Sequence, residues 1–193
     1  FYDLNNNRVL IISAPSGAGK TTLVNHLLKS GLPLAFSVSA TSRKPRGHEV
    51  NGREYYFITA TEFKRKIKAG EFVEWQEVYE NHYYGTLKKE IDRITKEGRI
   101  PLFDVDVKGG INLKKIFGDN ALALFIMPPS VEELKARLIK RGTDTPEDIN
   151  MRVEKAFSEI LLADSFDKVI VNDDLDRAGI EIRSVVKKFI KDR

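Results

Sequence analysis

The chain has 193 residues, of which 41% are hydrophobic and 31% charged, and it contains no cysteine. This composition is typical of one globular domain, or of one core with small inserted subdomains, and it excludes disulfides and thiolate catalysis. A net charge of +4 is too small to argue for nucleic-acid binding, and no apolar run is long enough to predict a membrane span. We therefore expect a cytoplasmic protein that binds neither nucleic acid nor membrane.

The first predicted elements are a strand, a glycine-rich turn and a helix. The apolar run 8–13 predicts a strand buried in a parallel sheet, and 21–30 predicts a helix that ends before Gly31. The turn between them is typical of a phosphate-binding loop, because glycines let backbone N–H groups face a nucleotide phosphate and a lysine adds positive charge. We predict that nucleotide phosphates are bound by Ala14, Pro15, Ser16, Gly17, Ala18, Gly19, Lys20, Thr21 and Thr22.

Two residues of this loop carry separate predictions. Thr21 is the first hydroxyl after the lysine and is placed to ligate the magnesium ion that accompanies a nucleoside triphosphate. Ala14 stands where the pattern G-x-x-x-x-G-K-[ST] has its first glycine, so we interpret the loop as a variant of that pattern. The alternative, a glycine-rich surface turn with a chance lysine, is disfavoured by the strand before it and the helix after it.

The next segment interrupts the alternation of strands and helices. After a predicted strand at 34–40, a polar loop at 41–54 precedes strand-like runs at 55–58 and 71–79 around a short helix at 62–69. This pattern predicts an inserted antiparallel subdomain. In 71–79, period-2 alternation places Val73 and Trp75 on one face and Phe72 with Glu74 on the other.

The rest of the chain returns to alternating elements. Strands are predicted at 100–106, 122–127 and 168–172, and helices at 87–96, 130–141, 146–160 and 178–190, so the fold class is α/β with a mostly parallel sheet. Ser130 and Glu133 predict a capping box. The buried stripe of the helix at 146–160 is predicted to comprise Ile149, Val153, Phe157 and Ile160.

Several polar residues suggest a second phosphate-binding site with a base pocket. Arg43 and Arg46, with Tyr55 and Tyr84, are able to converge on a second phosphate, the alternative being a solvated basic loop. Glu74 would distinguish guanine from adenine if it entered a base pocket, because a carboxylate accepts two hydrogen bonds from the N1–H and N2–H₂ edge of guanine. The alternative for Glu74 is an ordinary surface charge.

Other charged residues point to the donor phosphates. Alternation places Asp104 and Asp106 on one face at the end of a strand, beside the predicted phosphate loop, where one would hold magnesium through water and the other would contact substrate. The alternative is an acidic strand-end turn. Arg137, Arg141 and Arg152 flank the 142–146 connection and are candidate lid arginines, with exposed helix arginines as the alternative. On its helix, Arg141 is expected to point along the apolar stripe or into a cleft.

Five stretches in one order resemble the guanylate kinase family over nearly the whole chain. They are SVSATSRKPRGHEVNGREYYF (37–57), EFVEWQEVYENHYYGT (71–86), LFDVDVKGG (102–110), PPSVEELKARLIKRGTDT (128–145) and VIVNDDLD (169–176). The resemblance implies a three-layer phosphate-loop NTPase-type fold and magnesium-dependent transfer of the ATP γ-phosphoryl group to GMP, in purine nucleotide metabolism.

By matching positions, the resemblance also implies residue roles. Catalysis would use Lys20, Arg43, Arg137, Arg141 and Arg152; guanine would be read by Ser39, Glu74, Thr86 and Asp106; and the GMP phosphate would be held by Arg43, Arg46, Tyr55 and Tyr84. Arg137, Arg141 and Arg152 would act on the ATP phosphates, Asn172 matches a position near the adenine, and magnesium would be held by Thr21 and Asp104.

The domain organisation is implied in the same way. The core would comprise 1–40, 87–136 and 153–193, the GMP-binding subdomain 41–86 and the lid 137–152, and we expect a monomer or homodimer. A guanylate-kinase-like scaffold module is the main alternative, disfavoured because such modules characteristically lack an intact phosphate loop. A monophosphate kinase with another base preference is disfavoured by Glu74 with Ser39 and by the paired Arg43 and Arg46.

Overall fold

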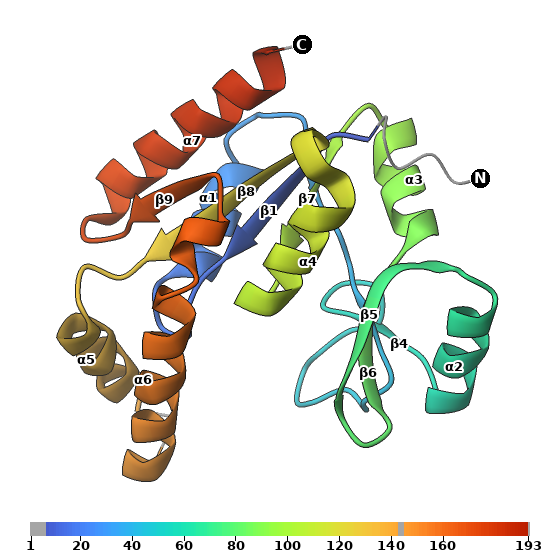
Figure 1. Ribbon diagram of the computed structural model, residues 1–193, viewed down its shortest axis with the longest axis horizontal. Helices are drawn as coiled ribbons and strands as arrows, with labels where there is room; N and C mark the ends of the chain where they lie inside the picture. The colour runs from blue at the N-terminus through green and yellow to red at the C-terminus, as the bar shows by residue number, and fades with distance from the viewer. Residues whose placement is uncertain (1–6, 143–144, 193) are drawn as a thin grey trace. The chain divides into compact units, whose positions relative to one another are not determined.

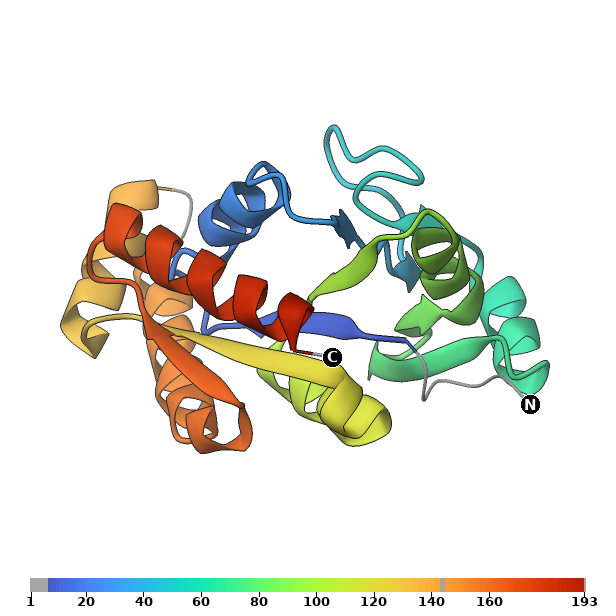
Figure 2. The same ribbon diagram turned by 90° about the horizontal axis from the view of Figure 1, so that it is seen from above.

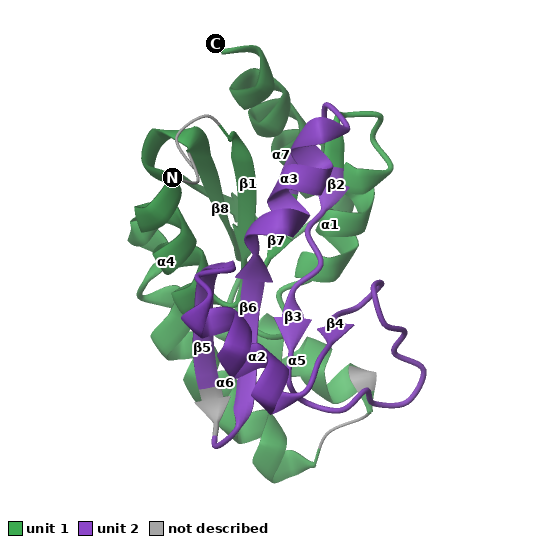
Figure 3. Cartoon of the chain, turned by 90° about the vertical axis from the view of Figure 1, so that its right-hand side faces the viewer, with its two compact units in different colours: residues 1–34, 102–193 green, residues 35–101 purple. Residues whose placement is uncertain are grey.

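The computed structural model describes residues 7–142 and 145–192, and for Val78, Tyr79 and Arg141 it describes the backbone alone. The chain forms two compact units, one of residues 1–34 and 102–193 and the other of residues 35–101 (Figure 3). Within the described ranges, no helix is both long and apolar enough to cross a membrane.

A five-stranded sheet forms the centre of the fold, in the order β2-β7-β1-β8-β9. Its strands are β1 (Val9–Ser13), β2 (Leu34–Phe36), β7 (Ile100–Asp104), β8 (Ala121–Met127) and β9 (Lys168–Val171). The pairs β1–β7, β1–β8 and β8–β9 are parallel. All five residues of β1 are buried, as expected for a parallel strand covered on both faces. The predicted α/β class with a mostly parallel sheet is confirmed.

Helices cover both faces of this sheet. The helices α1 (Lys20–Leu28) and α7 (Leu175–Lys191) lie on one face, and α4 (Val107–Phe117) lies on the other (Figures 1 and 2). Their apolar positions recur at helical spacing, for example Ile182 and Val186 of α7, which are fully buried. The phosphate-loop strand β1 is therefore held inside a three-layer core.

A helix pair, α5 (Val131–Arg141) and α6 (Pro146–Ile160), has a small apolar core of its own. In α6 both halves of a capping box are present at Thr145 and Asp148, with Pro146 in the first turn. In α5 the Ser130 side chain accepts from the Glu133 N–H, but the predicted box is not completed by a hydrogen bond from the Ser130 N–H to the Glu133 carboxylate.

Two predictions about buried and paired faces in this unit are wrong. Phe157 is 56% exposed, because the position seven residues after Ile149 is occupied by the buried Ala156, and Phe157 lies a further 100° around the helix. The strand predicted at 100–106 ends at Asp104, and Asp106 instead caps α4 by accepting a hydrogen bond from the Gly109 N–H at 2.7 Å. Strand alternation therefore does not extend from Asp104 to Asp106.

The second unit contains a four-stranded mixed sheet in the order β4-β3-β6-β5. Its strands are β3 (Ala40–Thr41), β4 (Tyr56–Phe57), β5 (Phe72–Tyr79) and β6 (His82–Leu87). The strand predicted at 34–40 is thus two strands in different sheets, and β6 was not predicted. The helix α2 (Ala60–Lys68) covers one face of the sheet, where Phe63 stacks on Phe72 with ring centroids 4.3 Å apart.

The helix α3 (Lys88–Lys96) completes this unit and carries a buried carboxylate. Glu90 is 2% exposed and accepts hydrogen bonds from the Val38 N–H at 3.1 Å, the Tyr56 hydroxyl at 3.0 Å and Arg93 Nη2 at 2.8 Å. Burial alone raises the pKa of Glu90, but the hydrogen bonds outweigh it and the net pKa is lowered. Glu90 therefore ties α3 to two other segments as an ionised group.

A bulge decides which way Glu74 faces. Phe72 pairs with Leu87, whereas Glu74 pairs with Thr86, so β5 advances two residues where β6 advances one. Directly opposed residues share a face, so Phe72 belongs with Leu87 on the side covered by α2, and Glu74 belongs with Thr86 on the opposite side. The prediction that Phe72 and Glu74 share a face is wrong because alternation is interrupted between them.

Candidate active site

The loop between β1 and α1 has the backbone that its glycines predict. Gly17 and Gly19 have φ of 91° and 90°, in the left-handed region that L side chains rarely adopt. Ala14 needs no such freedom, since Asn81 is the one non-glycine residue with positive φ in the described part of the chain. An alanine in place of the first glycine of the pattern therefore introduces no left-handed backbone strain.

The ammonium group of Lys20 points to the end of β7. It donates a hydrogen bond to the Val105 carbonyl at 2.9 Å and forms an ion pair with Asp104. Both side chains are about four-fifths buried. Parallel strands end at the same edge of the sheet, which explains why residues so distant in the sequence meet beside the loop.

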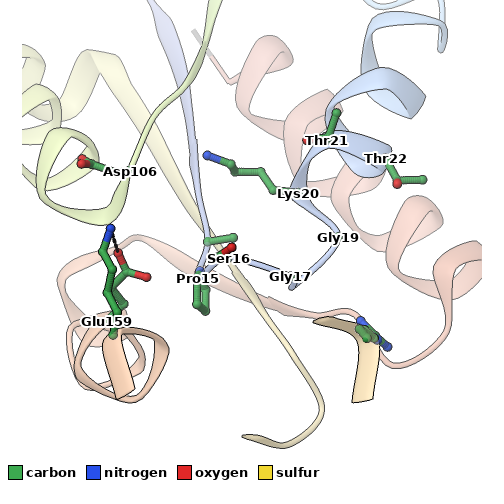
Figure 4. A pocket seen from close by; sticks show the side chains of 12 residues that line it. Pro15, Ser16, Gly17, Gly19, Lys20, Thr21, Thr22, Asp106 and Glu159 are labelled. Atoms are coloured by element: carbon green, nitrogen blue, oxygen red, sulfur yellow. Dashed lines mark ion pairs between the residues drawn. The ribbon is translucent and has the colours of Figure 1, made fainter. Parts of the chain in front are cut away.

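A cavity of about 500 Å³ opens at this loop (Figure 4). It is lined by Ala14, Pro15, Ser16, Gly17, Gly19, Lys20, Thr21, Thr22, Asp106, Arg137, Lys155 and Glu159. Figure 4 shows Lys20 extending from α1 toward the side of the cavity where Asp106 lies. Most of the predicted ATP-phosphate residues are thus brought together around one space.

Lys155 and Glu159 are cavity residues that the sequence reasoning missed. They follow Arg152 on α6 by three and seven residues, a spacing that places all three on one side of the helix. Arg152 Nη1 donates to Ser16 Oγ at 3.2 Å, and Lys155 Nζ lies 3.5 Å from Glu159 Oε1. Their spacing from Arg152 was the one signal in the sequence that could have identified them. It becomes informative only once the helix is known to lie beside the phosphate loop.

The Glu159 carboxyl is electrostatically strained in this cavity. Burial raises its pKa, the Lys155 ammonium lowers it, and the Asp106 carboxylate raises it further. A site lined by a phosphate loop and several cations is suited to an anionic ligand. Asp106 and Glu159 are the acidic residues in the lining, and Lys155 partly compensates the charge of Glu159.

The structure describes side-chain contacts for two of the three predicted lid arginines. Arg137 donates from Nη2 to the Asn172 carbonyl at 3.1 Å and from Nε to Glu133 at 3.0 Å. Arg152 contacts the loop through Ser16, as described above. The side chain of Arg141 lies outside the described residues.

In the second unit, Arg43 is the centre of a hydrogen-bond network. Its side chain is 9% exposed and donates from Nε to the Tyr84 hydroxyl at 3.1 Å, from Nη1 to the Lys44 carbonyl at 2.9 Å, and from Nη1 and Nη2 to the two Glu49 oxygens at 2.6 and 2.7 Å. The guanidinium also lies 5.0 Å from the Tyr55 ring centroid.

Glu49 was not predicted as part of the site. Besides the bidentate pair with Arg43, it accepts a hydrogen bond from the Arg46 N–H at 2.7 Å. These bonds lower the pKa of Glu49 to about 2, and the pairing raises the pKa of Arg43. The loop is therefore held by a permanent ion pair, and the exposed Arg46 side chain extends from the same turn.

The predicted base-reading residues are distributed over both units. Glu74 Oε1 accepts a hydrogen bond from the Thr86 hydroxyl at 2.9 Å, on the sheet face opposite α2. Ser39 is half-buried, and its backbone carbonyl accepts from the Tyr56 N–H at 2.8 Å. Asp106 belongs to the first unit and lines the cavity at the phosphate loop.

A phosphate loop after the first strand of a parallel sheet, with cations around the cavity beside it, defines a P-loop nucleotide-binding protein. The profile of the guanylate kinase family matches residues 6–189, and the chain belongs to this family.

Similar proteins match this chain over nearly its full length. The chain is 56% identical to a guanylate kinase of Porphyromonas gingivalis over 95% of this chain and 98% of the relative, and 51% identical to one of Bacteroides thetaiotaomicron over 95% and 90%. The crystal structure of guanylate kinase from Anaplasma phagocytophilum superposes with a TM-score of 0.73 at 31% identity, covering 94% of this chain and 85% of that one. The chain is a nucleoside monophosphate kinase that phosphorylates GMP with ATP.

Proposed function

We propose that the residues described above divide this reaction into a donor site on the first unit and an acceptor-binding surface on the second. The observation that carries the donor assignment is the phosphate loop with Lys20 at the mouth of the 500 Å³ cavity. Loop N–H groups, the N-terminus of α1 and the lysine ammonium all favour a polyphosphate.

The donor site would bind ATP through 14–22 and use three arginines on its phosphates. Arg137, Arg141 and Arg152 supply guanidinium groups that pair with phosphate oxygens and stabilise the charge of the transferring phosphoryl group. We assign 137–152, which includes two residues outside the described part of the chain, to a lid. Contact of Arg152 with Ser16 supports this assignment for one arginine.

The residues beside the loop fit magnesium bound together with ATP. Thr21 offers a hydroxyl on the first turn of α1 and Asp104 a carboxylate at the end of β7. The described residues contain no group of three or more His, Cys, Asp or Glu able to hold a metal by themselves. Magnesium in such sites uses one or two protein oxygens, water and substrate phosphates, and it supplies charge neutralisation at the phosphate oxygens.

The acceptor surface would recognise guanine through Glu74. The hydrogen bond from Thr86 orients the carboxylate, and a carboxylate has enough acceptor sites to take the N1–H and N2–H₂ donors of the base as well. Ser39 of the second unit is assigned to the same recognition, and Asp106 is proposed as a base contact supplied by the first unit. Adenine presents an unprotonated N1 to such a carboxylate, so the pairing would discriminate against AMP.

The GMP phosphate would be bound by Arg46, Arg43, Tyr55 and Tyr84. Arg43 already uses four N–H donors within the protein, so we assign it mainly to orienting this subsite and Arg46 to direct charge pairing. Phosphoryl transfer to a phosphate requires positioning and charge stabilisation more than a general base. We assign 41–86 to GMP binding and the remaining segments, 1–40, 87–136 and 153–193, to the core.

The test is ADP formation from ATP and magnesium with GMP, AMP, UMP, dTMP or no acceptor. We expect turnover that requires GMP and magnesium and is weak with the other nucleotides. Preference for another base would refute the Glu74 assignment. A folded sample that binds GMP without turnover would favour a scaffold module instead. The cytoplasmic location stays a prediction, and so does the oligomeric state, a monomer or a homodimer.

A further inference from the structure

Asn172 connects the turn after β9 to the phosphate loop. It is 5% exposed, and its Nδ2 donates a hydrogen bond to the Ala18 carbonyl at 2.8 Å, across 154 residues of sequence. A buried hydrogen bond between such distant segments is costly to leave unmade, because the carbonyl would lose its partner without gaining water.

The loop is shaped to admit this amide. A Cβ at Gly19 would lie 2.3 Å from Asn172 Nδ2, closer than any real contact, and Gly19 also has φ of 90°. Glycine at this position is therefore required twice, by its backbone conformation and by the space that the Asn172 amide occupies.

The hydrogen bond fixes the orientation of one peptide group. In a planar trans peptide the C=O and the following N–H point in opposite directions, so anchoring the Ala18 carbonyl on Asn172 turns the Gly19 N–H away from Asn172. Gly19 lines the cavity at the phosphate loop. The Gly19 N–H is thus held among the groups available to an anion there.

The backbone of Asn172 extends the connection. Its N–H donates to the Met127 carbonyl at 2.8 Å, and its carbonyl accepts from Arg137 Nη2 at 3.1 Å. One buried residue therefore bonds the loop, the end of β8 and an arginine that lines the cavity.

We propose that Asn172 is a positioning residue of the donor site, which holds the Ala18–Gly19 peptide in its phosphate-binding orientation, instead of a residue that reads the donor base. The inference rests on the donor site proposed above. It differs from the expectation of a position near the adenine, because the amide Nδ2 donates to the loop carbonyl of Ala18.

The experiment compares a polyphosphate that lacks a nucleobase with nucleoside triphosphates that carry one. Binding of magnesium tripolyphosphate, measured by displacement of ATP from the full-length protein, should weaken about tenfold or more in Asn172→Asp and Asn172→Ala, as for loss of one buried hydrogen bond. The KM values for ATP and for GTP used as donor should rise by the same factor, while the KM for GMP stays unchanged. Asp173→Asn, at the exposed neighbouring side chain, is the matched control and should leave all values unchanged.

Each other outcome has a distinct meaning. Unchanged tripolyphosphate binding with weaker ATP binding would overturn the proposal and indicate base reading. Wild-type protein that fails to bind tripolyphosphate in competition with ATP would instead refute the donor site itself. In Asn172→Asp, acidification should restore binding relative to wild type at the same pH, because a protonated carboxyl donates to the Ala18 carbonyl, whereas Asn172→Ala should not recover. Unchanged GMP binding by each variant establishes that it is folded.

Discussion

Replacing Glu74 by glutamine tests the guanine assignment most directly. The carboxylate accepts a hydrogen bond from Thr86, and the two oxygens of a carboxylate together offer about four acceptor sites, enough for two donors on a base as well. Hydrogen bonds to charged groups contribute about 1.5–3 kcal/mol each. An amide keeps one acceptor oxygen but turns an N–H₂ toward a guanine donor, so we expect a loss of about 3 kcal/mol, or roughly 10²-fold in kcat/KM for GMP.

The assay is initial-rate kinetics with GMP and with IMP at saturating ATP. IMP lacks the exocyclic amino group, so Glu74→Gln should reduce the preference for GMP over IMP while leaving the KM for ATP unchanged. Glu77→Gln is the matched control, because Glu77 pairs with Tyr83 on the other face of the same strand. If the KM for GMP did not change, or if the ratio of kcat/KM for GMP to that for IMP did not change, Glu74 would be an ordinary surface charge and not a base-reading residue.

Three other substitutions test separate parts of the structure. Lys20→Met should lower kcat by roughly 10²-fold or more with little change in GMP binding, measured by coupled ADP formation; normal turnover would contradict a role for its charge. Lys155→Met should raise the KM for ATP several-fold, and the exposed Lys135→Met on α5 should not; equal effects would rule out a phosphate contact. Glu90→Gln should destabilise the protein by about 2 kcal/mol at pH 7. Because the folded pKa of Glu90 is lowered, the stability it contributes is present above its unfolded pKa and is lost as pH falls through the folded pKa, so urea unfolding should show the difference shrinking in acid. A difference that grew in acid would contradict this reasoning.

Local patterns in the sequence predicted much of this molecule correctly. The order of strand, glycine-rich loop and helix at 8–30 requires only neighbouring residues, and so does the side-chain cap that Ser130 provides to α5. Such features depend on backbone geometry over a few residues, which sequence spacing specifies directly.

The predictions that failed were those that depended on where a strand pattern is interrupted. The end of β7 at Asp104 and the bulge between Phe72 and Glu74 each changed the direction of a side chain by a shift of one or two residues. A period-2 argument cannot place such interruptions, because they are set by pairing with a neighbouring strand.

The sequence by itself thus determined the class of fold, the phosphate loop and the family, since these rest on contiguous motifs. Tertiary structure alone decided that Lys20 meets Asp104, that Lys155 and Glu159 line the loop cavity, and that Asn172 holds the Ala18 carbonyl. These contacts join residues 84 to 154 positions apart for the lysine and asparagine pairs. The physical reason is that parallel strands bring their carboxyl ends to one edge of the sheet, whatever their separation along the chain.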